Sequence, residues 1–536
     1  MNTPANINLN WVDKLRIEQE FKRMPDSTWV LANENTYVNF YIVKGAQQLY
    51  AHQLRNFDKY QFDVQNADSI FGLLGPIHEL PEATAQTDTF WIHNRHVPLK
   101  EKESALDDLL AQLRKVPAFN VIIKTAEILI TGYIPTTADK DKSKFDFGPM
   151  NTTFSANHLE GFRMRVGGMT TANLNPHWFG SGYLAYGVND RKLKYNAKLT
   201  YSVNKKKYHE GESPVNNISA IQEYDVYTPG QDFLFTSKDN MFVAWKVGEP
   251  VTMMQYIRKT MLQYQKEWLN GLTLTTWARN ENNEAAGTLR YDRYDADGTL
   301  TNLKSFTNTE LGTQLRFAPG ERAYNGREGK NSLFNLSKDA PVFKLSHQMG
   351  LKNVLGSDFN YNHTEISAEK RIWLSSFGHI DALVTAGKVW DKVPFPLLIM
   401  PNTNQSITIQ PQAFNMMRAL EFVSDQYVSF YFTYYMKGWI LNRIPGVKWL
   451  RLREVISFSG FYGGLTDKNN PALDPTGLYR FPEGTSPMGR TPYLEASVGL
   501  ENIFKILRID YYRRLTYLDQ PNIKKGGVRI ALRFSF

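Results

Sequence analysis

Residues 528–536 read Val-Arg-Ile-Ala-Leu-Arg-Phe-Ser-Phe, and this stretch decides the fold. One face would carry Val528, Ile530, Leu532, Phe534 and Phe536, and the other the residues between them. Because successive side chains of a strand point to opposite sides, this alternation predicts a β-strand with one apolar and one polar face. Such a strand, ending the chain on an aromatic residue, is typical of an outer-membrane β-barrel, whose outside contacts lipid and whose interior is wet. The alternative is the last strand of a soluble β-sandwich.

The same alternation recurs upstream, and from about residue 151 the chain reads as strand after strand. We predict sixteen strands, near 162–166, 183–188, 193–203, 221–236, 239–248, 252–263, 266–279, 309–318, 341–350, 361–374, 377–388, 427–440, 453–462, 493–500, 505–517 and 527–536. Residues 251–263 also fit a helix, but a single-chain bacterial barrel needs an even number of strands. Short turns and long loops alternate between the strands, except that the inner connections at 319–340 and 441–452 are longer than expected.

Composition agrees with this interpretation. The mean hydropathy of -0.42 and the lack of any run of ~18 apolar residues exclude helical membrane spans, although barrel strands, being only half apolar, stay possible. The 32 Phe, 28 Tyr and 11 Trp suit aromatic girdles at two membrane interfaces, or a carbohydrate-binding β-protein. With no Cys, disulfides, thiolate metal sites and Cys nucleophiles are excluded. The net charge of +9 is spread along the chain, so we expect no nucleic-acid surface.

The chain divides into two parts at about residue 147. Residues 148–536 form the predicted sixteen-stranded antiparallel transmembrane β-barrel, and residues 1–147 form a small mixed α/β region. In that region 28–43 is strand-like around an Asn-Glu-Asn turn, and the leucine spacing of 103–116 predicts a helix. Residues 1–10 carry no signal-peptide pattern, so we expect an exported mature or truncated form behind an added Met.

Several segments resemble a known family. They are 147–149, 155–171, 393–398, 414–428 and 441–455. The chain from about 140 to 536 resembles a Bacteroidota outer-membrane family of unknown function, whose members are called carboxypeptidase regulatory-like domain-containing proteins. That barrel is in turn similar to the surface-antigen (BamA/TamA-like) superfamily, whose sixteen-stranded barrels insert or translocate proteins. One departure is that the Val-Arg-Gly-Phe/Tyr motif of the superfamily's inward loop is absent, and Met417-Arg418-Ala419 is the nearest sequence.

The resemblance implies a cellular setting and partners. The barrel would lie in the outer membrane with the N-terminal region in the periplasm. Its partners would be outer-membrane lipid, the barrel-assembly machinery and periplasmic or surface proteins. The implied role is protein insertion, translocation or envelope biogenesis.

A candidate lumen loop follows the eleventh predicted strand. Residues 391–418 fall where the superfamily folds a loop into its lumen. The core Pro394-Phe395-Pro396-Leu397-Leu398 is too apolar for a free loop. We therefore expect Pro394, Phe395, Pro396 and Arg418 to lie inside the barrel.

A candidate cationic lumen wall comes from the polar faces of the first, third and last strands. Its members are Arg163, Arg165, Lys194, Lys198, Arg529 and Arg533. These strands are neighbours if the barrel closes first strand to last, and buried cations need carboxylate partners or water. Glu160, Glu421 and Asp425 are candidate partners. The wall is either solvated or holds a plug through Arg418 or its neighbours.

A candidate seam lies where the first and last strands would meet, because both are rich in glycine. These residues are Gly161, Gly167, Gly168, Gly526 and Gly527. Glycine contributes no cross-strand side chain, so pairing there should be weak and could open sideways. The alternative is that these glycines only relieve crowding. We also expect Phe534 and Phe536 to act as the assembly signal of the closing strand.

Catalytic and metal-binding motifs are missing. There is no His-Glu-x-x-His, no Gly-x-Ser-x-Gly and no phosphate loop, and the calcium-loop-like start at 295–298 has Phe306 where a Glu is required. We therefore expect a protein that is not an enzyme and binds no cofactor. Three classes stay open: a barrel that assists protein insertion or envelope assembly, a passive or substrate-specific channel, and an outer-membrane enzyme or structural anchor. Only the resemblance favours the first.

Overall fold

The computed structural model describes residues 12–40, 49–60, 87–94, 131–137, 142–247, 251–321 and 339–533, with single residues or pairs at 62, 65, 121, 125, 128, 323–324 and 334–335. The chain forms two compact units. The first contains residues 1–125 with 504–506 and 534–536, and the second contains 126–503 and 507–533.

The described part of the first unit contains a three-stranded antiparallel sheet and a short helix. The sheet has the order β1 (Val12–Arg23), β2 (Trp29–Phe40) and β3 (Leu49–Asn56), and the helix is α2 (Asp88–Asn94). The expected turn at 33–35 is wrong, because β2 runs straight through it. Its polar side chains find cross-strand partners instead: Asn35 Oδ1 lies 2.9 Å from His52 Nε2, and Gln19 donates to Glu34 at 2.8 Å. The expected helix at 103–116 lies outside the described residues.

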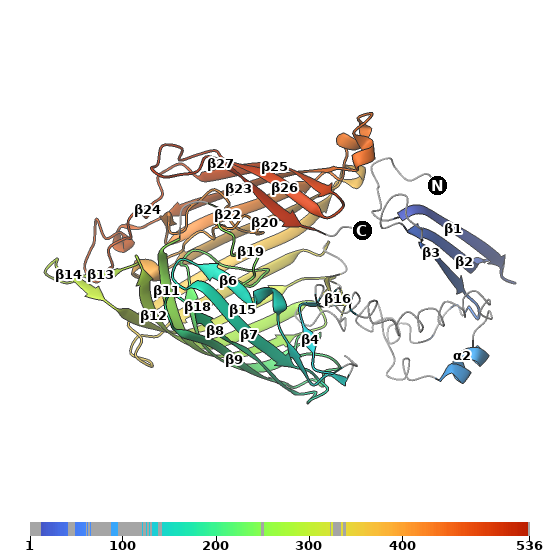
Figure 1. The fold of residues 1–536 in the computed structure, drawn as a ribbon, viewed down its shortest axis with the longest axis horizontal. Helices are drawn as coiled ribbons and strands as arrows, with labels where there is room; N and C mark the ends of the chain where they lie inside the picture. The colour runs from blue at the N-terminus through green and yellow to red at the C-terminus, as the bar shows by residue number, and fades with distance from the viewer. Residues whose placement is uncertain are drawn as a thin grey trace. The chain divides into compact units, whose positions relative to one another are not determined.

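The second unit is built on one large antiparallel sheet, whose long strands run side by side and curve (Figure 1). Among the described residues the sheet has eighteen strands. The three short ones come first: β4 (Ile134–Pro135), β5 (Phe145–Phe147) and β6 (Phe154–Asn157). The long ones follow in chain order: β7 (Gly161–Thr170), β8 (Trp178–Gly187), β9 (Leu193–Ser202), β10 (Asn216–Tyr227), β11 (Met253–Glu267), β12 (Leu272–Gly287), β15 (Ser305–Phe317), β18 (Val342–Gly350), β19 (Tyr361–Trp373), β20 (His379–Val389), β22 (Gln426–Tyr435), β23 (Arg453–Gly464), β25 (Tyr493–Ile503), β26 (Leu507–Arg514) and β27 (Gly526–Leu532).

Small hairpins and bridges decorate the connections. They are β13 (Tyr291–Tyr294) with β14 (Leu300–Leu303), β16 (Ala323–Tyr324) with β17 (Phe334–Asn335), and β21 (Phe422–Val423) with β24 (Ser486–Pro487). The sequence 295–298 is the turn of the first hairpin, where Gly298 N donates to Asp295 O at 3.0 Å. None of the helices in the described ranges is long and apolar enough to cross a membrane.

Fifteen of the sixteen predicted ranges overlap a long strand of the sheet, but the sheet has eighteen strands in the described residues, and 228–236 and 436–440 lie beyond the ends of β10 and β22. The ambiguous segment 251–263 is strand β11, paired with β10 on one edge and β12 on the other. The range 239–248 is wrong, since its described part, 239–247, forms turns with a single bridge at Lys246. The turn brings the Asp239 carboxylate to Arg163 and Arg165, at 3.2 and 2.8 Å. Pairing the buried Arg163 and the half-buried Arg165 outweighs continuing the strand.

In this sheet many apolar side chains are exposed and many charged side chains are buried, the reverse of the usual pattern. Val166 and Val498 are each 66% exposed on the outer face, whereas Arg163, Arg514 and Glu495 on the inner face are 0–1% exposed. The alternation predicted from the sequence is therefore present, with apolar residues outside and polar residues inside. An exposed apolar face this extensive marks a surface that meets another apolar phase. We call the polar, buried side of the sheet its inner face.

Aromatic rings lie over glycines of neighbouring strands on the inner face. A Cβ added to Gly312 or to Gly350 would lie 2.2 Å from the ring of Trp277 or Tyr361, respectively. Both rings are thereby held flat against the sheet with their polar atoms aimed at one carboxylate. Trp277 Nε1 and the Tyr361 hydroxyl donate to Glu310 at 2.9 and 2.8 Å.

Replacing Gly350 with Ala should lower the free energy of unfolding by about 1–3 kcal/mol, the usual cost of overpacking. The new Cβ would push the Tyr361 ring away and break its hydrogen bond to Glu310. Gly180→Ala is the matched control, because its Cβ would meet only Thr170 Cγ2, at 3.8 Å. Chemical denaturation of the purified protein in detergent measures both variants, and equal loss of stability would contradict the expectation.

Candidate functional site

The segment that joins β20 to β22 lies against the inner face of the sheet. We call its residues 391–418 the inner loop. Phe395 is 1% and Phe414 0% exposed. The Phe414 ring packs on Tyr431, Phe461 and Tyr493, with centroids 5.0, 6.2 and 5.4 Å away. Since these three residues belong to the inner rows of β22, β23 and β25, the loop fills the space in front of those strands.

A buried carboxylate ties the inner loop to β25. Glu495 accepts hydrogen bonds from the backbone N–H groups of Asn415 and Met416, at 2.8 and 2.9 Å, and from the Tyr493 hydroxyl at 2.9 Å. Two backbone amides aimed at one carboxylate hold it through charge-assisted hydrogen bonds. The loop backbone is thereby positioned relative to the sheet at this point.

Two arginines of the last strands make further contacts with the loop region. Arg514 of β26 donates to both carboxylate oxygens of Glu421, at 2.7 and 3.0 Å. Arg529 of β27 donates to the carbonyl of Asn415 at 2.6 Å. The bidentate Arg514–Glu421 pair is fully buried, so either charge left alone would be strongly destabilising.

The four expected lumen-loop residues lie in different parts of this region. Pro394 and Phe395 are buried and Pro396 is half-buried. The Arg418 N–H donates to Glu421 at 2.9 Å, and the guanidinium lies beside Gly484. Arg418 therefore sits at the end of the loop, away from the cations of β7 and β9.

The outer edge of β7 is paired along its length with residues 145–157. β5 covers its C-terminal end and β6 its N-terminal end. Between them, Gly148 N donates to Gly167 O at 2.9 Å, and Arg165 N donates to Thr153 O at 2.8 Å. The other edge of β7 pairs with β8. Both edges of β7 are therefore occupied, and β27 cannot pair with it. The first and last long strands are therefore not neighbours, and the seam glycines of β7 do not face those of β27.

The free edge of β27 is covered by a piece of the inner loop. We call residues 405–409 the bridging segment. Ile530 N donates to Ile407 O at 2.9 Å, and Ile409 N donates to Ile530 O at 2.8 Å. This makes a short parallel pairing centred on Thr408 and Ile530.

The bridging segment also pairs with residues 245–247. Ile407 N donates to Trp245 O and Val247 N to Gln405 O, each at 2.8 Å. From there, Met241 N donates to the carbonyl of Asn151 at 2.9 Å, in the segment that covers β7. Backbone hydrogen bonds thus run from β27 through two short internal segments to the cover of β7.

A second buried cluster contains three of the expected wall cations. Arg163 lies 2.8 Å from both Glu160 and Asp225. Lys194 contacts Glu160 at 2.7 Å, and Arg165 contacts Asp239 at 2.8 Å. Each cation therefore has a carboxylate partner, as burial requires.

The remaining wall residues do not join this cluster, and Lys198 pairs instead with Glu210 at 2.7 Å. Arg529 contacts the inner loop, and Arg533 lies 3.3 Å from Glu501 and 4.4 Å from the Tyr435 ring centroid. The expected single cationic wall is wrong in this respect, because β27 and β7 are separated. Gly526 and Gly527 pair with β26, while Phe534 and Phe536 lie outside the described residues.

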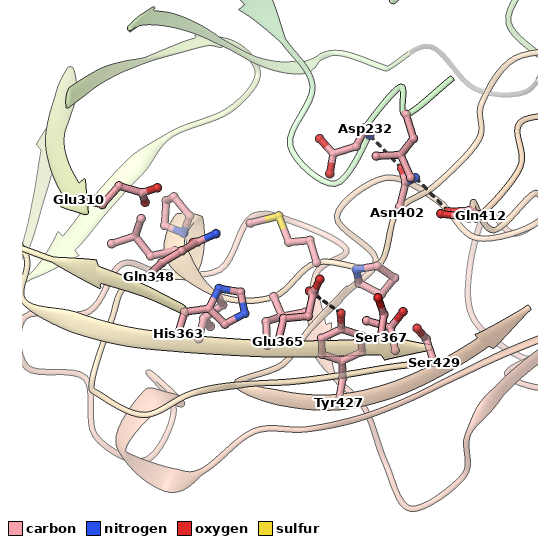
Figure 2. Close-up of a pocket in the computed structure, with 18 of the residues that line it drawn as sticks. Asp232, Glu310, Gln348, His363, Glu365, Ser367, Asn402, Gln412, Tyr427 and Ser429 are labelled. Carbon is pink, nitrogen blue, oxygen red and sulfur yellow. Dashed lines mark hydrogen bonds between the residues drawn. The ribbon is translucent and has the colours of Figure 1, made fainter. Parts of the chain in front are cut away.

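A cavity of about 570 Å³ lies between the inner loop and the strands β11 to β22. In Figure 2 its strand side carries Glu310, Gln348, His363, Glu365, Ser367, Tyr427 and Ser429, and its loop side carries Asp232, Asn402 and Gln412. Nearby protein atoms desolvate the Asp232 carboxyl and raise its pKa, and Arg279 opposes this effect. The lining is rich in amides, hydroxyls and carboxylates, which suits water or a polar solute. No group of three or more His, Asp or Glu in the described ranges could hold a metal ion.

The sequence interpretation missed several residues that organise this site. Asp225, Asp239 and Glu495 were not singled out, because their partners lie far away along the chain. The bridging segment left a readable signal: Ile407 and Ile409 alternate with Ser406 and Thr408, as in a strand.

Comparison with known proteins gives a family and two structural likenesses. Residues 126–469 match the family described as "Family of unknown function (DUF5686) C-terminal domain". No curated protein matches the chain. BamA from Haemophilus ducreyi lacking POTRA domains 1–3 is similar at a TM-score of 0.44 and 9% identity, covering 72% of this chain and 70% of that one. CdiB from Acinetobacter baumannii is similar at 0.34 and 12% identity, covering 70% and 57%.

Glu495→Gln should loosen the inner loop, because Gln lacks the charge that holds the amides of Asn415 and Met416. Hydrogen bonds to a charged group contribute ~1.5–3 kcal/mol, so loop opening should rise roughly tenfold or more. The rate at which a maleimide labels an Ala413→Cys reporter measures this, since Ala413 is buried and the chain has no other Cys. The exposed Glu483→Gln in the same background is the control. Equal labelling rates would show that Glu495 does not hold the loop.

Proposed function

We propose that this chain, which belongs to the DUF5686 family of unknown function, is an outer-membrane β-barrel that assists protein insertion, translocation or envelope assembly. It does so without enzymatic chemistry of its own. The barrel lies in the membrane and the N-terminal region lies in the periplasm. Partner proteins of the periplasm, the cell surface or the barrel-assembly machinery complete the process.

The membrane setting is supported by the inside-out burial of the sheet. Apolar side chains cover its outer face, while arginines and carboxylates pair on the inner face. In lipid every backbone group needs a partner, so the sheet has to close and its edges have to be covered. Residues 145–157 cover β7 and the bridging segment covers β27. We propose that the wall of the barrel closes through these pieces.

The main support for the assembly role is the small number of backbone hydrogen bonds on one edge of β27. Its edge toward β26 has seven paired positions, from Leu507–Leu532 to Arg513–Gly526. Among the residues that the structure describes, its other edge makes two backbone hydrogen bonds, both at Ile530 and both with the bridging segment. We call the contact between β27 and the bridging segment the joint. Because the bridging segment is not a strand of the wall, the joint can separate while every hairpin in the wall stays intact. Such a joint lets an extended polypeptide pass between the lumen and the membrane.

A second candidate is a substrate-specific channel, and the polar cavity of Figure 2 favours it. A cavity lined by amides, hydroxyls and carboxylates can hold a polar solute on its way through the lumen. In that case the inner loop acts as a gate and the joint at β27 stays closed. The two functions differ in whether β27 has to separate from the bridging segment.

Val498→Arg should lower the free energy of unfolding in a bilayer by ~2–4 kcal/mol, the cost of a cation at the lipid-facing midplane of a barrel. Val498 is 66% exposed in the middle of β25. Leu355→Arg is the control, because Leu355 is 74% exposed in the connection between β18 and β19. Denaturant unfolding in lipid vesicles measures both. The membrane assignment fails if the two substitutions cost the same.

A disulfide between Thr408→Cys and Ile530→Cys should abolish the protein's role in envelope assembly. The two positions form the bridge that closes β27, and the chain has no native Cys to interfere. The readout is the level of other outer-membrane proteins in cells whose only copy is the double variant, with and without reductant.

The control locks the same strand on its other side. Ile509→Cys with Ile530→Cys joins β27 to β26 at paired positions and leaves the bridging segment free. We expect this lock to be tolerated. If the Thr408–Ile530 lock also supports normal envelope assembly, separation of β27 is not the mechanism and the channel becomes the better assignment.

A further inference from the structure

The connection between β22 and β23 is an ordered platform, which explains why it is longer than a simple turn. The Glu454 carboxylate accepts hydrogen bonds from the N–H groups of Ile440 and Leu441. Asn502 donates to the carbonyl of Arg451 at 2.6 Å. The 3-10 turns η5 (Leu441–Arg443) and η6 (Lys448–Leu450) complete the backbone pairing.

This ordered backbone presents large apolar side chains to the outside. Trp449 is 71% exposed, and Ile440, Ile444 and Leu450 are 47%, 41% and 43% exposed. A rigid connection that exposes this much apolar surface marks an interaction site.

The platform is also strongly basic. Residues 436–453 contain five Lys or Arg and no Asp or Glu. Arg443 and Lys448 are exposed, and neither has a carboxylate partner among the described residues. Arg443 lies 5.6 Å from the ring centroid of Trp439. Exposed cations without carboxylate partners, next to exposed aromatic rings, suit binding to a bilayer that has anionic headgroups above an apolar layer.

The platform is continuous with the outer face of the sheet. The Trp439 ring packs edge-on against Phe377 with centroids 5.1 Å apart. The carbonyl of Phe377 accepts a hydrogen bond at 2.9 Å from the hydroxyl of Tyr434, in the outward row of β22. At the same end of the sheet, Phe317 and Phe343 are paired and exposed. Aromatic residues gathered at one end of an apolar face are characteristic of a membrane–water interface.

We infer that Trp439, Ile440, Arg443, Ile444, Lys448, Trp449 and Leu450 form a lipid-docking surface for anionic phospholipids. The apolar side chains insert at the boundary between headgroups and acyl chains, and Arg443 and Lys448 bind the headgroup phosphates, as in interfacial amphipathic segments. The surface anchors this end of the sheet to its leaflet. The inference rests on the proposed membrane barrel.

Fluorescence quenching tests this surface in the full chain. An environment-sensitive fluorophore is attached to Trp449→Cys, Val498→Cys or Leu355→Cys, each the sole Cys. The proteins are reconstituted in vesicles of phosphatidylcholine alone or of phosphatidylcholine and phosphatidylglycerol in equal parts. Quenchers are lipids labelled near the headgroup or deep in the chain, and aqueous iodide. We expect Trp449→Cys to respond to the shallow lipid quencher, Val498→Cys to the deep one and Leu355→Cys to iodide.

The charged part of the surface is tested by Arg443→Gln with Lys448→Gln. In the parent protein, adding phosphatidylglycerol should move the label at position 449 deeper into the bilayer. In the double variant this change in depth should be severalfold smaller. Lys352→Gln with Lys524→Gln removes two exposed cations at the opposite end of the sheet and should change nothing.

The outcomes separate this inference from the barrel itself. If the label at 498 is quenched by lipid and the label at 449 only by iodide, the docking surface is wrong and the barrel stands. If the label at 449 is shielded from both quenchers, protein covers the platform and the inference is also wrong. If neither 449 nor 498 meets lipid, the membrane barrel itself fails.

Discussion

The structure depends on one constraint: the long strands turn most of their apolar side chains outward and most of their charged side chains inward. An inward charge in a place with little water has to find an opposite charge, because an unpaired buried ion costs several kcal/mol. The chain meets this requirement pair by pair. Arg163 has Glu160 and Asp225, and Arg514 has Glu421. The interior is therefore a set of specific ion pairs, and its geometry is as defined as that of an apolar core.

The inner loop belongs to that interior, because the strands alone cannot satisfy their inward groups. Glu495 forms no direct salt bridge in the described residues and accepts hydrogen bonds from backbone amides of the loop instead. Arg529 likewise takes a loop carbonyl. Phe414 and Met417 fill the apolar space around these contacts. Removing the loop would leave charges of β25 and β27 without partners, so the loop and this side of the wall stabilise each other.

Most of the sheet could be predicted from the sequence, because period-two alternation is local and is present in most of the long strands. The inside-out polarity of Val498 and its neighbours followed from the same pattern. What could not be predicted is which inward group meets which. Arg163 and Asp225 are 62 residues apart, and nothing in the spacing selects that pair. The turn at 239–247 illustrates the limit: the sequence predicts a strand, but the chain turns there and Asp239 contacts two arginines.

The edges of the sheet show how polarity and topology combine. An apolar outer face excludes water from the wall, so an unpaired strand edge in that wall would leave backbone groups without partners. A plain barrel solves this by pairing its first and last strands along their length. Here β7 is covered by the segment before it, and β27 is covered by a piece of a loop that returns from the inside. The edge of β7 is paired along its length, whereas in the described residues the bridging segment pairs with β27 only at Ile530. The weaker cover lies on β27, the strand whose Arg529 also contacts the inner loop. Movement of that loop would therefore change both the contacts of β27 and the packing on the inner face of the sheet.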